Sequence, residues 1–184
     1  SDVLPLEKQV KMIRAFLPDA TKIGVIYTTS EPNSVSHLEK LQGIAADNGF
    51  EVIAVGVTNS SEVASAAASV VAQGADCINN FTDNNVVDNL SAVIKAANDG
   101  GIPVFGSEIE QVKNGCLASE SIDYVALGEQ TGRMAARILS GEDASTMPVE
   151  EVEDATPVYN SEVLEALGLT LPADYQDAQD VSAA

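Results

Sequence analysis

Four times along this chain, a short apolar segment is followed by a polar loop and then by a segment with the spacing of a helix. The apolar segments are Lys22–Tyr27, Glu51–Val57, Cys77–Phe81 and Ile102–Gly106. Short apolar strands that alternate with helices are typical of a parallel sheet with right-handed crossovers and helices on both faces. The pattern therefore predicts an α/β fold.

The segments between the predicted strands carry helical periodicity and helix-capping residues. Pro18 is expected to end the first helix, and Gly49 to cap the second at its C-terminus. The expected helices are an N-terminal one with Leu6, Val10, Ile13 and Leu17 on one face, then Ser34–Asn48, an Ala-rich helix that ends near Gln73-Gly74, Val86–Asn98, and a short helix up to Asn114-Gly115.

The pattern changes after Gly115. The tail from Met147 onward is too short to form a domain of its own, so we expect it to pack against the main body or against a lobe that lies outside this chain. Its expected elements are a strand Cys116–Ser119, a helix that Asp123 caps and that ends at Leu139, two extended segments around Thr156-Pro157 within Met147–Tyr159, and a short helix Glu162–Leu167.

Charge and residue types disfavour several classes of function. With 28 acidic and 9 basic residues the net charge is −19, which repels phosphate backbones and anionic lipids, so we expect no nucleic-acid or membrane-surface binding. The sequence has no Cys-x-x-Cys motif, and the single His37 falls on a helix predicted to be exposed, so we expect no metal site. Cys77 and Cys116 lie in apolar runs, and their spacing leaves disulfide pairing open.

Functional residues are expected in the polar loops that follow the strands. In open α/β sheets, ligands bind at the carboxyl ends of the strands, where helix N-termini offer free N–H groups. The first of these loops reads Tyr27-Thr28-Thr29-Ser30-Glu31-Pro32-Asn33-Ser34. It joins the first predicted strand to the longest of the early helices.

Five groups of residues recur in the order and spacing of a known family, and from about Ser1 to Pro172 the chain resembles it. The family is that of the extracytoplasmic substrate-binding proteins of bacterial ABC importers, in the branch associated with tryptophan and tyrosine. The matching residues are Leu4-Pro5-Leu6-Glu7-Lys8-Gln9, Pro32-Asn33-Ser34, Thr82-Asp83-Asn84, Ile102-Pro103-Val104-Phe105 with Val112-Lys113-Asn114-Gly115, and Asp123-Tyr124 ahead of Leu127-Gly128-Glu129-Gln130-Thr131-Gly132.

The resemblance implies a type I periplasmic-binding fold of two Rossmann-like α/β lobes with the ligand in the cleft between them. Residues 1–115 are then expected to form the second lobe, and residues 116–184 to supply a crossover strand, a helix and a tail that complete the first. Most of the first lobe and a signal or lipoprotein segment are expected upstream of Ser1. The implied location is extracytoplasmic, periplasmic or lipid-anchored, and the implied partner is an ABC permease in the membrane.

The implied ligand is an amino acid, and each of its charged groups needs particular partners in the protein. Its carboxylate needs several N–H and O–H donors, and Ser30, Asn33 and Ser34 at the start of a helix are the candidates. Ordinary helix capping is the alternative explanation for these three residues, because serine and asparagine favour caps in any protein.

The ammonium group of an amino acid needs an anionic or carbonyl acceptor that is kept from bulk water. Asp83, within Thr82-Asp83-Asn84, is the candidate acceptor, and Ser107 and Glu108 are candidates for further polar contacts. Helix capping is again the alternative for Thr82-Asp83-Asn84. For Glu108 the alternative is an acidic residue in the first turn of a helix, where the helix dipole favours negative charge.

An aromatic ligand side chain would need flat apolar surface, which Tyr27 and Phe81 supply unless they belong to the core. The pair Asn79-Asn80 departs from the family pattern, since apolar residues are more usual in a central strand. Asn80 is expected either to point into the cleft and alter specificity or to need a buried partner.

Two other classes of function are alternatives to a binding protein. An effector domain of a bacterial transcription regulator has the same fold, and a basic DNA-reading segment upstream would favour it. An enzyme would need a nucleophile–base pair, a metal set or a glycine-rich phosphate loop, and the sequence carries none of these patterns. We therefore expect a binding protein without cofactor or catalytic residues.

Overall fold

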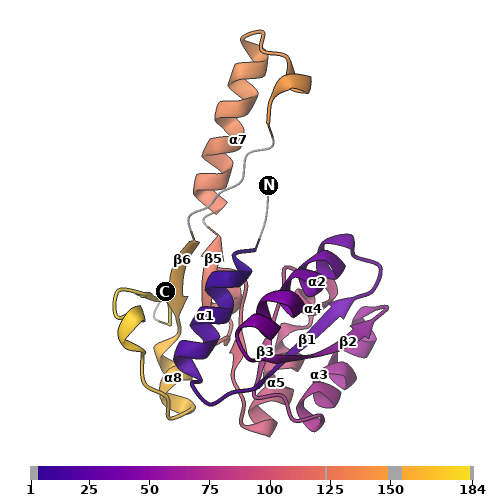
Figure 1. The fold of residues 1–184 in the computed structure, drawn as a ribbon, viewed down its shortest axis with the longest axis vertical. Coiled ribbons are helices and arrows are strands. Elements are labelled where there is room, and N and C mark those ends of the chain that lie inside the picture. Colours follow the sequence, from indigo (N-terminus) through magenta and orange to yellow (C-terminus); the bar gives the residue numbers. More distant parts are fainter. Residues whose placement is uncertain (1–3, 123, 149–154, 183–184) are drawn as a thin grey trace.

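A parallel sheet forms the centre of the computed structural model, which describes residues 4–122, 124–148 and 155–182 (Figure 1). Its strand order is β2-β1-β3-β4, so the chain starts in the middle and crosses over in both directions. All three strand pairings are parallel. The strands are β1 (Lys22–Thr28), β2 (Glu51–Val57), β3 (Cys77–Asn79) and β4 (Val104–Phe105). The predicted α/β fold with a parallel sheet is confirmed.

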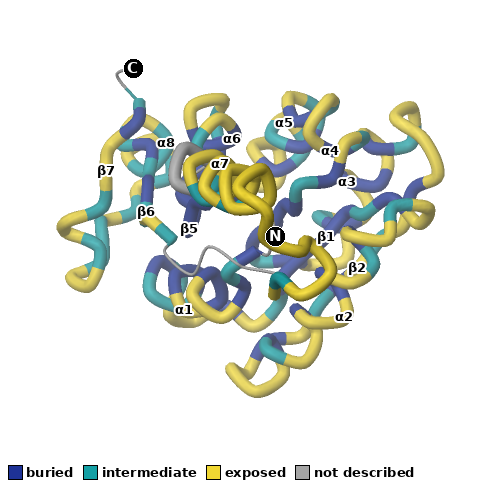
Figure 2. The backbone as a smooth tube through the Cα atoms, turned by 90° about the horizontal axis from the view of Figure 1, so that it is seen from above, coloured by how far each residue is buried: buried dark blue, intermediate teal, exposed yellow. Residues whose placement is uncertain are grey.

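Helices cover both faces of this sheet (Figure 2). Helices α1 and α2 pack on one face, and α3, α4 and α5 pack on the other. Alternate residues of β1 serve the two cores, with Val25 on the first face and Ile26 on the second. The helices are α1 (Leu6–Phe16), α2 (Pro32–Asp47), α3 (Val63–Ala72) after the 3₁₀ turn η1 (Ser60–Glu62), α4 (Asn84–Asp88), α5 (Leu90–Gly100) and α6 (Ile109–Lys113).

A second group of strands continues the sheet beyond β4. Strand β5 (Ala118–Ile122) pairs antiparallel with β6 (Ala155–Tyr159), which pairs parallel with β7 (Gln179–Asp180). Two backbone hydrogen bonds attach the start of β5 to β4, from Leu117 N to Val104 O at 2.7 Å and from Gly106 N to Ala118 O at 2.9 Å. The strand predicted at Cys116–Ser119 therefore begins two residues later and has neighbours on both sides.

The end of the chain packs on the main body. Helix α8 (Ser161–Ala166) and the 3₁₀ turn η3 (Ala173–Tyr175) follow β6, and Leu164, Leu169 and Leu171 pack on the core between α1 and the sheet. The ring of Tyr175 lies 5.8 Å from that of Phe16 in α1, measured between centroids. For residues 155–182, the first of the two expected packing arrangements is confirmed.

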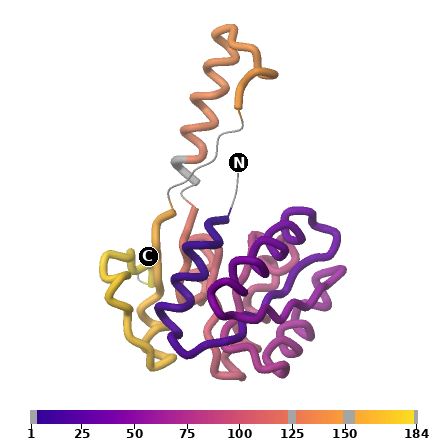
Figure 3. The backbone as a smooth tube through the Cα atoms, viewed as in Figure 1, coloured from indigo at the N-terminus to yellow at the C-terminus, as the bar shows by residue number. Residues whose placement is uncertain are grey.

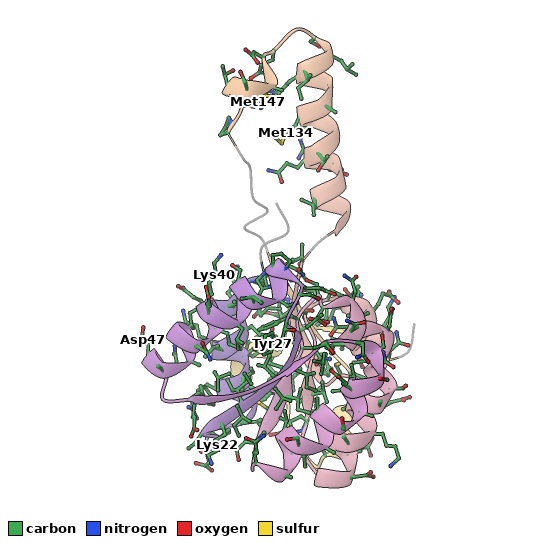
Figure 4. All side chains as sticks on the ribbon, turned by 90° about the vertical axis from the view of Figure 1, so that its right-hand side faces the viewer. Lys22, Tyr27, Lys40, Asp47, Met134 and Met147 are labelled. Carbon is green, nitrogen blue, oxygen red and sulfur yellow. The ribbon has the colours of Figure 1, made fainter. Side chains whose placement is uncertain are left out.

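Helix α7 (Tyr124–Leu139) projects away from this body (Figure 3). It leaves on the side where β1 ends, as the positions of Lys22 and Tyr27 show, and carries Met134 on the projecting part (Figure 4). From residue 127 onward none of its side chains is buried, and Leu139 is 89% exposed. The turn η2 (Ala144–Thr146) follows it. No helix in the described part of the chain is long and apolar enough to cross a membrane.

Several expected details are wrong for local reasons. The helix predicted at Val86–Asn98 is two helices, because Asn89, with φ −116° and ψ 24°, interrupts the helical backbone. Strand β3 ends at Asn79 instead of Phe81. His37 is buried instead of exposed, because its ring packs on Phe81 at 5.6 Å between centroids. Of the two extended segments expected in the tail, β6 contains Thr156 and Pro157, and residues 149–154 lie outside the described residues.

The two cysteines are free and fully buried, which answers the pairing question that the sequence left open. Burial raises the pKa of both thiols, and nearby carboxylates raise it further. A raised pKa lowers the fraction of reactive thiolate at any given pH.

We therefore predict that neither Cys77 nor Cys116 reacts with Ellman's reagent at pH 8 in the folded protein. The same assay in denaturant should release two thiols per chain. Rapid labelling of either cysteine under native conditions would contradict the buried positions.

Candidate functional site

The candidate residues lie in three loops at one edge of the sheet. The first loop follows β1 and leads into α2, the second follows β3 and leads into α4, and the third follows β4 and leads into α6. Because the strands are parallel, these three loops meet at the carboxyl edge. This is the side from which α7 projects (Figure 4).

The carboxylate of Asp83 holds the first two loops together. It is completely buried, and Oδ2 accepts hydrogen bonds from the backbone N–H of Thr28 at 2.6 Å and from the hydroxyl of Ser34 at 2.7 Å. Oδ1 accepts from the hydroxyl of Thr28 at 2.7 Å and from the backbone N–H of Val86 at 3.2 Å. Each carboxylate oxygen thus accepts two hydrogen bonds, which is the usual acceptor capacity of a carboxylate. The end of β1 and the starts of α2 and α4 are thus fixed to one residue.

Both acidic candidates cap helices, and Glu108 does so from the position before its helix, not from the expected first turn. Asp83 caps α4 through Val86, and Glu108 caps α6 by accepting from the backbone N–H groups of Glu110 and Gln111, each at 2.7 Å. The contact expected between Asp83 and a ligand ammonium stays a prediction. So does a ligand contact of Glu108, which is half-buried at the same edge.

Helix α2 starts differently, because no side chain caps its N-terminus. Pro32 stands in its first turn, and Asn33 is exposed there, with a weak hydrogen bond from Nδ2 to the carbonyl of Thr82 at 3.4 Å. Ser30 is also exposed, whereas Ser34 is fully buried against Asp83. The first turn of a 16-residue helix therefore faces the carboxyl edge with backbone donors that no side chain caps.

The other candidates lie in the second and third loops. Asn84 is exposed and donates to the carboxylate of Glu31 from its backbone N–H at 3.3 Å and from Nδ2 at 3.2 Å. Thr82 is half-buried. Ser107 is buried, and its hydroxyl oxygen accepts from Nε2 of Gln111 at 2.9 Å. The fold thus gathers all the candidates at one edge, and Ser30, Asn33 and Asn84 are its most accessible members.

Sequence reasoning gave no role to Gln9, whose side chain joins α1 to β3, to β5 and to the residue that follows β4. Its Nε2 donates to Oδ1 of Asn79 and to the carbonyl of Gly106, both at 2.9 Å. Its Oε1 accepts from the backbone N–H of Glu120 at 2.9 Å. A polar residue on the apolar face of a predicted helix was the available signal for this buried link.

Glu120 is the second residue that sequence reasoning missed. It lies on β5 and is only 7% exposed. Burial raises the pKa of its carboxyl group, while a hydrogen bond from Tyr175 and the charge of Lys8 act in the opposite direction. The carboxylate of Glu120 therefore lies in a partly desolvated environment beside Gln9.

Two further observations bear on the kind of site. Among residues 4–122, 124–148 and 155–182, no group of three His, Cys, Asp or Glu side chains is placed to hold a metal ion. A groove of about 430 Å³ lies between α3 and α5, lined mainly by alanines such as Ala64, Ala68 and Ala92. The two charged residues that also line this groove, Lys95 and Asp99, are exposed and already form an ion pair with each other at 2.6 Å.

Comparison with known proteins identifies the family. A family model described as ABC transporter substrate binding protein matches residues 1–180. The chain is also 37% identical over 169 residues to a tyrosine-binding protein of Clostridioides difficile strain R20291, covering 92% of this chain and 49% of that protein. The chain therefore belongs to the ABC transporter substrate-binding protein family.

Solved structures agree with this assignment. An ABC domain from Streptococcus pneumoniae, in complex with L-Trp, superimposes with a TM-score of 0.88 at 28% identity, covering 95% of this chain and 59% of that one. The ligand-free, open structure of a substrate-binding protein with adhesive properties from Clostridium difficile gives 0.80 at 37% identity, covering 100% and 62%. The chain thus spans about half the length of the curated relative and about three fifths of these structures.

From the Asp83 geometry we predict that Asp83→Ala destabilises the protein by about 3 kcal/mol, because it leaves buried donors on Thr28 and Ser34 without an acceptor. Urea unfolding monitored by circular dichroism measures this loss. Asp88→Ala, which removes an exposed aspartate from the same helix α4, should change the stability by less than about 0.5 kcal/mol. Equal effects of the two substitutions would contradict the clamping role of Asp83.

Proposed function

We propose that this chain is part of the extracytoplasmic solute-binding component of a bacterial ABC importer, and that its ligand is an aromatic amino acid such as tryptophan or tyrosine. The family membership supports the transport role. The ligand proposal is supported by the name of the tyrosine-binding relative and by the L-Trp complex of the similar structure. The partner in this proposal is the membrane permease of the importer.

The observation that carries the proposal is the uncapped N-terminus of α2 at the carboxyl edge. Its backbone N–H groups and the side chains of Ser30 and Asn33 form the proposed site for the ligand carboxylate. The positive end of the helix dipole adds to the attraction. Carboxylates bind readily at such helix ends.

The ligand ammonium is proposed to lie beside Asp83, between Thr82 and Asn84. All four acceptor positions of Asp83 are used, so the ammonium would replace the Ser34 hydroxyl on Oδ2. Ser34 is then released to donate to the ligand carboxylate. Ser107 and Glu108, after the neighbouring strand, provide the remaining polar contacts of the proposed site.

The proposed mechanism is binding with closure. Residues 1–115 form the second lobe in this proposal, and α7 extends towards the first lobe from the edge where the ligand binds (Figure 1). A ligand that contacts both lobes favours the closed arrangement by its higher affinity for it, and the permease recognises that arrangement. No bond is made or broken. The alternative of a regulator's effector domain has less support, because the matching family model is that of the binding proteins.

For the full-length protein we predict stabilisation by L-Trp, L-Tyr or L-Phe in a thermal-shift screen against the twenty amino acids, sugars and nucleosides. A ligand present at 100 times its Kd adds about 2.7 kcal/mol to the free energy of unfolding. Stabilisation by a sugar or nucleoside with no response to amino acids would contradict the proposed ligand class.

The carboxylate site has its own test by calorimetry. Asn33→Ala should lower the affinity for the stabilising amino acid about tenfold, which corresponds to about 1.4 kcal/mol. Asn48→Ala changes an exposed asparagine at the opposite end of the same helix and should leave the affinity unchanged. Equal affinities of the two variants would exclude the Asn33 side chain from the carboxylate site.

A further inference from the structure

The side-chain amide of Asn80 is buried without hydrogen-bond partners. Asn80 directly follows β3 and is 1% exposed, yet neither Nδ2 nor Oδ1 has a partner among the described residues. Buried amides are nearly always paired, so this one calls for an explanation beyond the packing of the chain.

Asn80 borders a small cavity at the carboxyl edge. The cavity measures about 10 Å³, and Ser107 and Glu120 also line it, under the segment Leu4–Leu6. A volume of this size takes about one water-sized group. The cavity lies at the ends of β3 and β4, in line with the loops of the candidate site.

The neighbours of Asn80 leave a defined set of hydrogen-bonding groups. Gln9 and Asn79 are committed to one another and to the backbone. The hydroxyl oxygen of Ser107 accepts a hydrogen bond from Gln111, and the hydroxyl proton of Ser107 is therefore left to donate. The group that completes this pocket must therefore accept from Ser107 or Asn80 Nδ2 and donate to Asn80 Oδ1.

We propose that Asn80 and Ser107 form a specificity pocket that binds a hydroxyl group at the end of the ligand's side chain. This inference rests on the proposed function, since it assigns the far end of the amino acid bound there. A hydroxyl is one water-sized oxygen that both donates and accepts, which matches the unpaired amide. An ammonium group would find acceptors in Asn80 Oδ1 and in the carboxylate of Glu120, which lines the same cavity, but it only donates and so leaves Asn80 Nδ2 unpaired. An aromatic C–H edge pairs with neither atom of the amide.

The spacing of the sheet places this pocket at a suitable distance from the carboxylate site. From β1 to β4 there are two strand spacings, on the order of 10 Å. A ligand held by its carboxylate at the start of α2 can therefore extend across β3 and present its side-chain tip to Asn80 and Ser107. The pocket then distinguishes tyrosine from phenylalanine, because binding phenylalanine leaves the buried amide unpaired.

The test is calorimetry of the full-length protein with L-Tyr, L-Phe and L-Trp. The wild type is expected to bind L-Tyr at least about tenfold more tightly than L-Phe. Asn80→Leu, which has a similar volume and no polar atoms, should abolish this preference by weakening L-Tyr and not L-Phe. Asn98→Leu, at an exposed position on α5, should leave the preference unchanged.

Four results would overturn the pocket, and they differ from one another. Equal affinities of the wild type for L-Tyr and L-Phe exclude hydroxyl recognition while leaving the proposed function intact. A preference for L-Tyr that survives Asn80→Leu, together with a lower Tm of that variant, assigns Asn80 to an ordered structural water. Binding of L-Trp without binding of L-Tyr or L-Phe overturns the pocket alone, and failure to bind all three aromatic amino acids overturns the proposed function and the pocket with it.

Discussion

The buried carboxylate of Asp83 is the interaction on which the carboxyl edge of the sheet depends. It joins the end of β1, the first turn of α2 and the start of α4 through four hydrogen bonds, two of them to side chains. A buried charge is costly unless donors surround it, so these donors and the loops that carry them are held in one arrangement. Asp76 acts similarly at the opposite edge, where it accepts from the backbone of Thr21 and Lys22. Between these two aspartates, β1 is fixed at both ends.

The second polar connection is Gln9, whose side-chain amide is fully hydrogen-bonded, in contrast to that of its neighbour Asn80. Gln9 uses its whole amide to tie α1 to Asn79, Gly106 and Glu120. Next to it, Asn80 is equally buried and unpaired. Gln111 at the same edge leaves its Oε1 unpaired but donates from Nε2 to Ser107 and Phe81, whereas Asn80 has neither amide atom paired among the described residues. The contrast points to a group outside the described residues. Residues held in place by hydrogen bonds around an unpaired group are what a selective binding pocket requires.

The features that could be predicted from the sequence are those that depend on residues close to one another along the chain. The alternation of apolar runs and helices predicted the parallel α/β sheet, and the loop positions predicted the edge at which Ser30, Asn33, Asp83 and Ser107 gather. Sequence reasoning missed what depends on distant partners. Asp83 meets Thr28 and Ser34 across 55 and 49 residues, and Gln9 meets Glu120 across 111. The pairing of β5 with β6 and the burial of His37 by Phe81 depend on tertiary packing, which local periodicity does not encode.

The central claim is that the ligand binds at the carboxyl edge of this sheet. A crystal structure of the full-length protein with the amino acid that stabilises it tests this most directly. The account predicts electron density for the ligand across the ends of β1, β3 and β4, with its carboxylate at the start of α2. Density in the alanine-lined groove between α3 and α5, or elsewhere away from this edge, would contradict it.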